Sequence, residues 1–589
     1  MQAAVVRAMV AGLAHRGPDA AGIVVTACGA LGMCHLRVRS NEADRVPLSI
    51  GSVCVAYNGE VYSVGTGHEP IVPVDPREEV TALLDADVRV VDGMYALASL
   101  GDSHVTLARD QFAIKPLYVH EQAGSVGFAS ELPVLLAAAS PLAIDRSALL
   151  ETLSFGRTLD GRTVYEGIRE LEAGRRTTYW SSGLIEVEPA VTGTCGRADD
   201  SDLRGIIRET LQQTLLSKRR LGLALSGGLD SSILAYELRE LGIRHLRTVS
   251  VLVESRRDGL ESLDGLGLGH DAVTATWRHS VIRVVGDEFF AGIERTVELL
   301  GEPTRLSSVP LYLALAAKAA ERGVVVLITG EGADELFAGY ESYCSVAFAA
   351  DPVAAALAFY LPPARCEYLT LLFGRGAVLA LRQRLRDRVV AAAEQLQHLS
   401  TMRLLLSLER DLSLRPLLRR ADHALMRYSV EGRVPYLHGG VPLCAAGLSD
   451  RQLGCSGRGK EALRTAYRGV LPDHVVEGPK VAFRAPVSSL LRGRLGQIAE
   501  RRVRAAASHL AMLDMDPSGA VKIVTEARRG DAEACSLTVG LLSTIAWIAW
   551  LDRMVAASDN GSPMAASASR SRSDGIHDAV ERSSSLRAR

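Results

Sequence analysis

The chain has few cysteines, and none of them stands in a pattern that builds a site. Its nine cysteines are spread over 589 residues without a repeated short spacing. This excludes a disulfide framework and favours a reducing, cytoplasmic compartment. No CxxC pair and no cysteine–histidine cluster indicates zinc. The first residues show no basic stretch followed by an apolar core, so no signal peptide is predicted.

The chain also lacks an excess of either charge. The formal net charge is −2 and no basic, aromatic-rich patch is visible, so neither a nucleic acid nor an anionic membrane is an expected partner. The most apolar late segment, residues 536–551, is short for a membrane span. We expect it to form a buried C-terminal helix.

What the chain does have is length and two kinds of local pattern. A chain of 589 residues is too long to fold around one hydrophobic core, so several domains are expected. In the first part, short valine-rich runs such as 52–62 and 184–191 are bounded by turn residues, which predicts β-strands. From about residue 203, strand-like runs alternate with helical segments, which predicts an α/β fold with a parallel sheet.

These changes in composition give the expected domain boundaries. The first domain is expected at 1–192, a linker at 193–202, and the second domain at 203–556, within which 352–430 is almost wholly helical. The remainder, 557–589, is rich in serine, arginine and alanine and is predicted to be a disordered tail.

The stretch LALSGGLDSSILAY, residues 223–236, ends a predicted strand and begins a predicted helix. The small residues of SGGLDSS can present backbone N–H groups and hydroxyls to one phosphate, and the helix N-terminus adds its dipole. A carboxylate such as Asp230 beside bound phosphates is explained when Mg²⁺ lies between them. Taken alone, the loop is also compatible with an ordinary strand–helix turn capped by serines.

A second strand-like run, VVVLITG, leads into the loop EGADELF at residues 331–337. Small residues again follow the end of a parallel strand, and Asp334 is a second candidate Mg²⁺ ligand. Ligands of open α/β sheets bind at the carboxyl ends of the strands. We therefore expect the two loops to face one site.

Together, SGGLDSS and TGEGADELFAGY resemble the synthetase domain of the glutamine-dependent asparagine synthetase family. The members of that family are PP-loop ATP pyrophosphatases with a HUP-like parallel sheet. The resemblance extends over residues 205–552, and further stretches match in order at 301–320, 417–437 and 459–486. It implies that the domain binds ATP and a carboxylate, forms an acyl-adenylate with release of pyrophosphate, and lets ammonia or an amine displace AMP.

The resemblance also assigns roles to residues. Asp230 and Asp334 would hold Mg²⁺, which offsets charge on the leaving pyrophosphate. Lys480 would stabilise developing negative charge, and Glu331 would assist deprotonation of the incoming amine. ATP and pyrophosphate would contact Ala224, Leu225, Ser226, Gly227, Gly228, Asp230, Ser231, Ser232, Val251, Thr329 and Gly330.

The chain departs from the family pattern at two places in this domain. The family's PFLD is PYLH here, so His438 replaces a carboxylate, and RxK is GPK at 478–480, which loses an arginine. His438 is either a surface substitution or a change near the acceptor pocket that puts aspartate in doubt as the substrate. Relatives that close a β-lactam carry tyrosine where this chain has Glu331, so Glu331 favours the chemistry of asparagine synthetases.

The first domain resembles the N-terminal-nucleophile glutaminase domain of the same family, an αββα fold. In that domain an N-terminal cysteine attacks glutamine, and its free α-amine serves as the base. Here residue 2 is Gln2, and the first strand before HRGPD is absent. Cys28, Cys34 and Cys54 lie inside the chain and are expected to be small buried apolar residues. The matching stretches are 11–22, 55–62, 107–120 and 127–132.

The expected glutamine pocket is altered as well. Asn58, Gly59 and Glu60 match the family's YNGE, which contacts the substrate and the oxyanion. The family arginine that binds the glutamine carboxylate falls on His35, and the acidic position that binds its amine falls near Arg77. Replacing the arginine by His35 removes a side chain that binds a carboxylate through two hydrogen bonds. Replacing the acidic residue by Arg77 would repel the positively charged amine of glutamine. We therefore expect an inactive glutaminase.

The sequence thus predicts a carbon–nitrogen ligase that uses ATP and Mg²⁺ and joins an aspartate-like carboxylate to ammonia or an amine. Two alternatives stay open: an ordinary glutamine-hydrolysing asparagine synthetase with a clipped N-terminus, and a specialised amide synthetase of the β-lactam or lasso-peptide cyclase type. A catalytically dead interaction protein is disfavoured by the intact loops. The expected partners are small molecules, with a homodimer and a separate source of ammonia or amine left open.

Overall fold

The structure is a computed structural model that describes most of the chain. The described residues are 2–39, 46–65, 71–73, 75–85, 88, 90–122, 124–139, 142–190, 202–253, 273–344, 346–396, 400–454, 458–480 and 483–559. Residues 2–190 are named the front domain and residues 202–559 the rear domain. The predicted linker, except Asp202, and the predicted tail after Asp559 lie outside the described residues.

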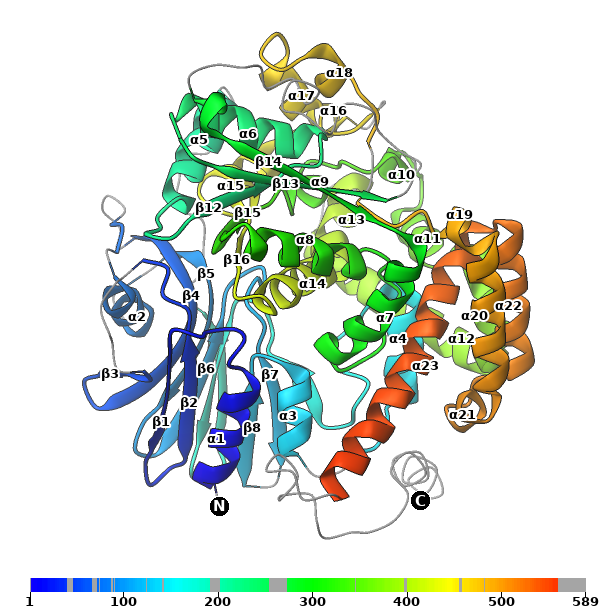
Figure 1. Cartoon of the computed structure of the whole chain (residues 1–589), viewed down its shortest axis with the longest axis horizontal. Helices are drawn as coiled ribbons and strands as arrows, with labels where there is room; N and C mark the ends of the chain where they lie inside the picture. Colours follow the sequence, from blue (N-terminus) through cyan, green and yellow to red (C-terminus); the bar gives the residue numbers. More distant parts are fainter. Residues whose placement is uncertain are drawn as a thin grey trace.

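The front domain is a sandwich of two sheet layers covered by helices, at the lower left of Figure 1. One layer is an antiparallel six-stranded sheet in the order β11-β10-β6-β5-β4-β3, and the other holds the pair β1-β2 and the triple β8-β7-β9. Helices α1 and α3 pack on the second layer and α2 packs on the first, which gives the predicted αββα order. The elements are α1 (Gln2–Gly12), β1 (Ala20–Val25), β2 (Ala30–His35), β3 (Leu48–Ile50), β4 (Val53–Gly65), α2 (Pro76–Leu84), β5 (Val90–Leu100), β6 (His104–Arg109), β7 (Tyr118–Gln122), β8 (Ser125–Ala129), α3 (Leu132–Ala138), α4 (Arg146–Phe155), β9 (Ile168–Glu170), β10 (Arg175–Trp180) and β11 (Ile185–Pro189).

The rear domain is built on a five-stranded, all-parallel sheet in the order β14-β13-β12-β15-β16. The predicted alternation of strands and helices is confirmed here. The central strands β12, β13 and β15 are mainly apolar, whereas the edge strands β14 and β16 carry charged residues. Its elements up to β15 are α5 (Leu203–Thr214), β12 (Leu221–Ala224), α6 (Leu229–Glu240), β13 (Arg247–Val253), a 3-10 turn (Thr274–Thr276), β14 (Arg278–Val284), α7 (Gly286–Leu300), α8 (Val309–Glu321) and β15 (Val326–Ile328).

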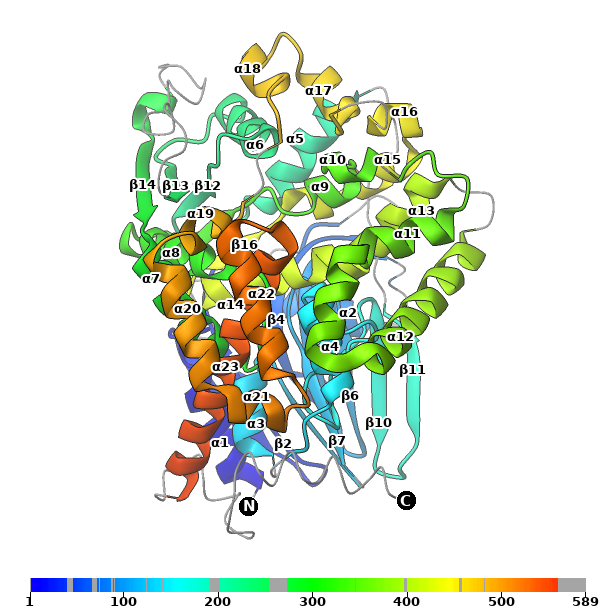
Figure 2. The ribbon, with the colours of Figure 1, turned by 90° about the vertical axis from the view of Figure 1, so that its right-hand side faces the viewer.

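The sequence after β15 is mostly helical, as predicted for 352–430. Figure 2 shows α20, α22 and α23 packed side by side at the edge of the rear domain. The elements are α9 (Ala333–Leu336), α10 (Glu341–Cys344), α11 (Pro352–Tyr360), α12 (Pro363–Gln395), α13 (Thr401–Glu409), a π-helical turn (Arg410–Leu414), α14 (Arg415–Met426), β16 (Glu431–Arg433), a 3-10 turn (Pro435–Leu437), α15 (Val441–Gly447), α16 (Asp450–Leu453), α17 (Glu461–Tyr467), α18 (Asp473–Val476), α19 (Val487–Leu491), α20 (Arg494–Ala505), α21 (Ala507–Met512), α22 (Pro517–Arg529) and α23 (Ala532–Asp559).

Helix α23 contains the apolar segment 536–551. Among the described helices, only α23 is long and apolar enough to cross a membrane, over Ala532–Ala556. In this structure 78% of its most apolar window is buried inside the protein, and Trp547 is fully buried. The predicted buried C-terminal helix is therefore confirmed.

Helix α14 lies between the two domains and carries buried charges (Figure 1). Asp422 accepts a hydrogen bond from Arg16 at 2.7 Å and lies 3.6 Å from the Lys115 ammonium. Arg16 also donates to Glu131 at 3.0 Å. Arg16, Lys115 and Glu131 come from three of the front-domain stretches that match the family. In this structure Arg16 and Lys115 join the domains through Asp422, and Glu131 holds Arg16 in place, which does not require glutaminase activity.

A second interdomain contact involves Glu60 of β4. Its carboxylate lies 3.4 Å from the guanidinium of Arg433, which is fully buried at the end of β16. Arg433 also donates to Glu431 at 2.9 Å and to the carbonyls of Thr214 and Leu216 at 2.7 and 2.8 Å. Glu60 therefore contributes one of two carboxylates that face this buried guanidinium.

A third interdomain contact explains the unusual His438. The histidine is 1% exposed, its Nδ1 lies 3.0 Å from Asp92 of β5, and its ring meets the Tyr62 ring edge-on at 4.6 Å. Asp92 also accepts the backbone N–H of Gly439 at 2.7 Å. The surface substitution considered for His438 is therefore wrong. His438 does not line the rear-domain pocket either, so it gives no argument about the substrate.

We predict that His438→Asp destabilises the protein, because it would place a carboxylate against the buried Asp92. Loss of a buried pair of this kind costs about 3 kcal/mol or more. The change should appear as a lower midpoint in urea unfolding. His245→Asp is the matched control, since His245 is exposed and has a left-handed backbone that Asp tolerates. Equal midpoints for both variants would contradict the assigned contact.

Candidate active site

The SGGLDSS loop connects β12 to α6. Gly227 has a φ of 70°, and helix α6 begins after Gly228 without a side-chain cap. The Ser231 hydroxyl folds back, accepting the Ser226 N–H at 3.1 Å and donating to the Gly228 carbonyl at 3.2 Å. The serine therefore holds the turn itself, and the first-turn N–H groups of α6 point toward a potential anion.

The two predicted acidic residues meet at one lysine. Strands β12 and β15 are neighbours, so the loops that follow them lie side by side at the carboxyl edge of the sheet. The ammonium of Lys460 lies 2.7 Å from Asp230 and 2.6 Å from Asp334. The prediction that both loops face one site is confirmed by this geometry.

Lys460 is the residue that sequence reasoning missed. It is 3% exposed, although it directly precedes helix α17, where a positive charge opposes the helix dipole. Its backbone is left-handed, with a φ of 57°, and a Cβ on Gly339 would lie 2.2 Å from its Cε. A lysine directly before the helix of GKEALR, after a glycine, was the available signal. Such a strained, buried charge is typical of functional sites.

Lys480 completes the cluster from the other side. Its ammonium pairs with Asp334 and lies 3.7 Å from Asp230. Burial alone would lower the pKa of Lys480. The carboxylates of Asp334 and Asp230 raise it by more than burial lowers it, so the pKa is raised overall. Burial would likewise raise the pKa of Asp334, but Lys460 and Lys480 lower it. Each of the two lysines therefore lies between both carboxylates in one network of ion pairs.

The cluster fits the expected cofactors. Magnesium takes one or two protein carboxylates together with phosphate oxygens, and Asp230 and Asp334 supply that number. Thr329 Oγ1 and Ser232 Oγ are buried and have no hydrogen-bond partner among the described residues. Thr329 also lines the rear pocket, so its unpaired hydroxyl is available to a phosphate, whereas Ser232 does not line the pocket. When bound, Mg²⁺ would neutralise charge on pyrophosphate.

Glu331 is held in the same pocket by two groups from other helices. Arg420 of α14 donates to its carboxylate at 2.6 Å, and the Tyr312 hydroxyl of α8 donates to the same oxygen. Arg420 also donates to Ser308 at 2.6 Å and lies over the Tyr312 ring at 4.3 Å. Glu331 therefore has a fixed orientation with one oxygen engaged and the other able to accept a proton.

A rear pocket of about 610 Å³ is lined by Asp230, Asp334, Lys480, Glu331 and Arg420, but not by Lys460. The sequence did not single out Arg305, Tyr312 or Arg420, which also line it. Gly227, Gly228 and Ser232 belong to the loop but do not line the pocket. The predicted residues that line it are Ala224, Leu225, Ser226, Asp230, Ser231, Val251, Thr329, Gly330, Glu331, Asp334 and Lys480.

Arg305 is a buried cation of the pocket that forms no ion pair with an acid among the described residues. Its Nη1 is buried and has no hydrogen-bond partner among the described residues. Burial and the neighbouring Arg365 lower its pKa to about 9, only partly countered by Glu533, and Glu533 is already engaged by Arg365. A buried guanidinium without an anion is a binding position for an acidic group of a ligand.

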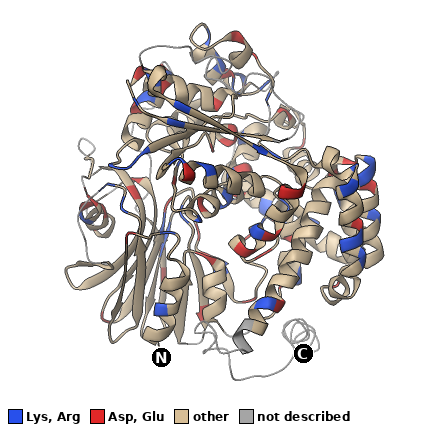
Figure 3. Ribbon diagram, in the orientation of Figure 1, with Lys and Arg blue, Asp and Glu red and all other residues tan. Residues whose placement is uncertain are grey.

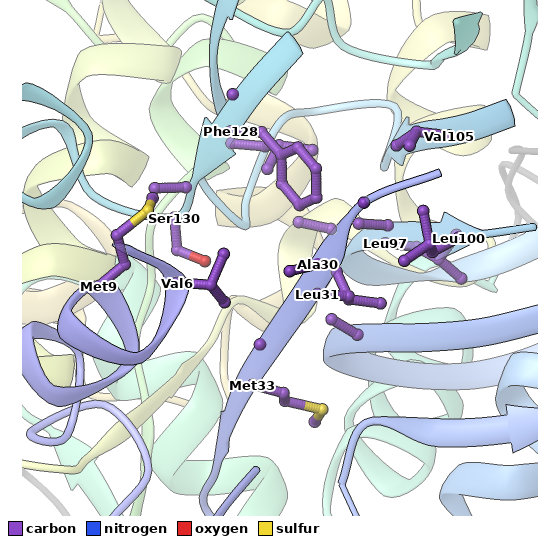
Figure 4. A pocket seen from close by; sticks show the side chains of 18 of the residues that line it. Val6, Met9, Ala30, Leu31, Met33, Leu97, Leu100, Val105, Phe128 and Ser130 are labelled. Atoms are coloured by element: carbon purple, nitrogen blue, oxygen red, sulfur yellow. The ribbon is translucent and has the colours of Figure 1, made fainter. Parts of the chain in front are cut away.

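The front domain contains a larger cavity of about 1550 Å³, seen in Figure 4. Asn58, Gly59, Glu60 and His35 line it, as expected for a former glutamine pocket. Arg77 does not line it: the side chain is exposed and donates to the Ser49 carbonyl at 3.0 Å. The repulsion expected at Arg77 therefore has no support, since the charge lies outside the cavity.

The charged groups inside this cavity bind one another. Arg39 donates to Glu79, to Glu60 at 3.5 Å and to the Val61 carbonyl at 3.1 Å. Glu79 also accepts from the Tyr57 hydroxyl at 2.5 Å and from the Val61 N–H at 3.0 Å. Neither the arginine nor the two carboxylates is free to bind the ends of an amino acid.

The three front-domain cysteines are half-buried, less buried than expected. The Cys34 thiol donates to the Val10 carbonyl at 3.1 Å, and burial raises its pKa to about 11. A thiol with a raised pKa is a poor nucleophile because the thiolate is the reactive form. Cys28 and Cys54 pack against the apolar core of the front domain. None of the three has the environment of an activated cysteine.

Two family models match the chain. The model described as asparagine synthase matches residues 202–552, and the model described as glutamine amidotransferase domain matches residues 83–188. The second match starts after His35, Asn58, Gly59, Glu60 and Arg77, so the pocket residues lie outside it.

Curated relatives align over most of the chain. Asparagine synthetase [glutamine-hydrolyzing] 1 of Bacillus subtilis (strain 168) is 25% identical, with 82% of this chain and 84% of the relative covered. A putative asparagine synthetase [glutamine-hydrolyzing] of Mycobacterium bovis is 25% identical, with coverage of 88% and 89%. Asparagine synthetase [glutamine-hydrolyzing] of Triphysaria versicolor is 28% identical, with 56% of each chain covered.

We predict that Glu79 makes the stability of the front domain depend on pH. Burial raises its pKa to about 7, although Arg39 and Tyr57 lower it; Glu60 and Glu431 also face it. Because the pKa of Glu79 in the folded protein lies above the ordinary value of 4.5, binding of a proton to Glu79 stabilises the fold. This contribution to the free energy of unfolding is present below about pH 4.5 and is lost as the pH rises through about 7.

Glu79→Gln should therefore flatten the fall of the melting temperature between pH 5 and pH 8. The control is Glu78→Gln, because Glu78 is exposed on the same helix. The test is to measure the melting temperatures of the wild type and of both variants at four pH values. Parallel curves for the wild type and Glu79→Gln would show that Glu79 titrates in its ordinary range.

Proposed function

The chain belongs to the asparagine synthase family of carbon–nitrogen ligases, and from this premise we propose that it activates an acidic carboxylate with ATP and joins it to free ammonia or an amine. The observation that carries the proposal is the cluster of Asp230, Lys460, Asp334 and Lys480 at the carboxyl ends of β12 and β15. Its charges suit a metal-bound polyphosphate.

In the first proposed step, a substrate carboxylate oxygen attacks the α-phosphorus of ATP. The bond between that phosphorus and the pyrophosphate oxygen breaks, and AMP stays on the carboxylate. The N–H groups of α6 and the ammonium groups of Lys460 and Lys480 would stabilise the departing pyrophosphate. Asp230 and Asp334 would hold Mg²⁺.

In the second step, the amine nitrogen attacks the activated carbonyl carbon, and the bond from that carbon to AMP breaks. The nitrogen loses a proton, for which the Glu331 carboxylate is the acceptor in the pocket. Arg420 and Tyr312 fix the carboxylate by binding one of its oxygens. The second oxygen is the one that would receive the proton.

The substrate is proposed to carry a second acidic group. Arg305 lines the rear pocket, and its buried Nη1 lacks a partner among the described residues. A guanidinium in this position favours a dicarboxylate such as aspartate, one carboxylate being activated and the other bound by Arg305. This supports an aspartate-like substrate despite the change at His438, which lies outside the pocket.

The nitrogen is proposed to come from free ammonia or an amine. In the front cavity Arg39, Glu60 and Glu79 are engaged with one another, and the Cys34 thiol is held protonated. The front domain then acts as a structural part of the ligase, joined to it through Arg16, Glu60 and Asp92.

A pyrophosphate exchange assay tests the activation step. The full chain, ATP and Mg²⁺ are incubated with labelled pyrophosphate and a panel of mono- and dicarboxylic acids. We predict exchange with at least one dicarboxylate and a loss of about 100-fold or more in Asp230→Asn, because a positioned metal ligand is removed. The control Asp287→Asn lies at an exposed site on α7 and should retain activity. Unchanged exchange in Asp230→Asn would rule out the assigned site.

The nitrogen source is tested in the same assay by measuring product with ammonium or with glutamine. Product from ammonium alone supports the proposal. Product from glutamine at a comparable rate would show an ordinary glutamine-hydrolysing enzyme.

We predict that Arg305→Gln raises the KM for the dicarboxylate by roughly 10- to 100-fold, with a smaller change in kcat. The range follows from loss of one charge-assisted hydrogen bond of about 1.5–3 kcal/mol. Arg295→Gln, an exposed change on α7, is the control. The KM for ATP should stay unchanged. An equal effect of Arg305→Gln on mono- and dicarboxylates would contradict the role.

A further inference from the structure

One turn of helix α14 contacts the rear pocket on one side and the front domain on the other. Arg420 donates hydrogen bonds to Glu331 and to Ser308, both at 2.6 Å. Asp422, two residues later, accepts a hydrogen bond from Arg16 at 2.7 Å. Residues two apart on an α-helix lie about 200° apart around its axis. The candidate base of the rear pocket and a cation of the front domain therefore lie on opposite faces of one helix.

Asp422 obtains its counter-charges from the front domain. Among the described residues, Arg16 and Lys115 are the cations that pair with it, and the Lys115 ammonium lies 3.6 Å away. Asp422 is 5% exposed and Lys115 is 1% exposed. Burial raises the pKa of Asp422, whereas Arg16 and then Lys115 lower it, and the pKa is lowered overall. The carboxylate is therefore charged, and its charge is balanced from the other domain.

The loss of one of these cations would act on α14. Arg16 also donates to Glu131 at 3.0 Å, and His15 contacts Glu131 at 2.9 Å. Figure 3 shows charged residues of both signs where the two domains meet and few in the lower part of the front domain. An excess negative charge at this buried boundary is costly unless the segment that carries it moves toward water. For Asp422 that segment is α14.

A shift of α14 would reach Glu331 through Arg420. The Arg420 guanidinium lies over the Tyr312 ring at 4.3 Å, and the Tyr312 hydroxyl donates to the same Glu331 oxygen as Arg420 does. Tyr312 belongs to α8, which packs against α14. Displacing a catalytic group by about 1 Å can lower a rate by about 100-fold. The orientation of Glu331 therefore depends on where α14 lies.

The groups assigned to the activation step are held by other elements. Asp230 and Asp334 lie in the first turns of α6 and α9, and Lys480 lies beyond α18. Among these assigned groups and Glu331, Glu331 is the one that accepts a hydrogen bond from α14 within the described structure. A displaced α14 should therefore impair deprotonation of the amine more than activation of the carboxylate.

We propose that Arg16 and Lys115 are positioning residues for the amide-forming step. By pairing with Asp422 they hold α14 in place, and α14 holds the Glu331 carboxylate where it receives the proton of the attacking amine. The inference rests on the proposed function, in which Glu331 takes that proton in the second step. The front domain then contributes to catalysis through its buried charges, and this contribution does not require hydrolysis of glutamine.

The test compares the two steps in the full chain. Lys115→Met removes one buried cation and keeps a side chain of similar length. Pyrophosphate exchange measures activation, and a single turnover started with ammonium measures amide formation. We expect amide formation to fall at least roughly tenfold, with less than about a twofold change in exchange and in the KM for the dicarboxylate. Arg169→Met is the control and should change neither step, because it removes an exposed ion pair with Glu121 inside the front domain.

A second variant separates positioning from a loss of packing. Lys115→Met combined with Asp422→Asn removes one positive and one negative charge, so the charges balance again, and the new amide oxygen can still accept from Arg16. We expect amide formation to recover to within about threefold of the wild type. A purely structural defect would not be repaired by changing a second side chain. If Lys115→Met does not fold, Arg16→Lys replaces it, because it keeps the charge with a shorter reach, and amide formation should again fall relative to exchange.

The outcomes distinguish this inference from the proposed function. Equal losses in both steps, no loss in either step, or no recovery in the combined variant would overturn the positioning role and leave the ligase reaction standing. A wild-type protein that exchanges pyrophosphate with no dicarboxylate would overturn the proposed function, and the positioning role with it.

Discussion

The structure depends on a helix that is buried on all sides and still carries charge. Along α14, Arg419 and Asp422 reach the front domain, whereas Arg420 between them reaches the rear pocket. Charges that are buried must be paired, so this helix can occupy its place only when both domains supply partners. The position of α14 therefore determines both the contact between the domains and the geometry of the active site.

The rear pocket shows how such pairing prepares a site. Asp230 and Asp334 would repel one another across the two loops, but Lys460 lies between them and Lys480 flanks them. The cluster is neutral as a whole, so it can remain ordered without ligand and exchange its internal partners for a metal and phosphates. Preorganised charge of this kind needs little rearrangement during the reaction.

The parts of the site that the sequence predicted are local. Asp230 and Asp334 lie in the first turns of α6 and α9, just after predictable strands, and the rule that parallel strands end at one edge brings them together. Lys460 could not be placed that way, because its approach to the aspartates depends on the fold of 458–480 over both loops. The surroundings of His438 and Arg77 also depend on the tertiary fold, so the sequence did not predict them. His438 is buried by the front domain, and Arg77 lies on a helix and points away from the cavity.

The buried ion pairs between the domains also bear on how this protein can change over evolutionary time. If the front domain were deleted, Asp422 would lose both of its basic partners, Arg16 and Lys115, whereas Arg433 would keep Glu431. A shortened descendant would therefore expose a face of the rear domain whose charge pairing has changed. Selection for a stable ligase can thus retain the front domain whether or not that domain hydrolyses glutamine.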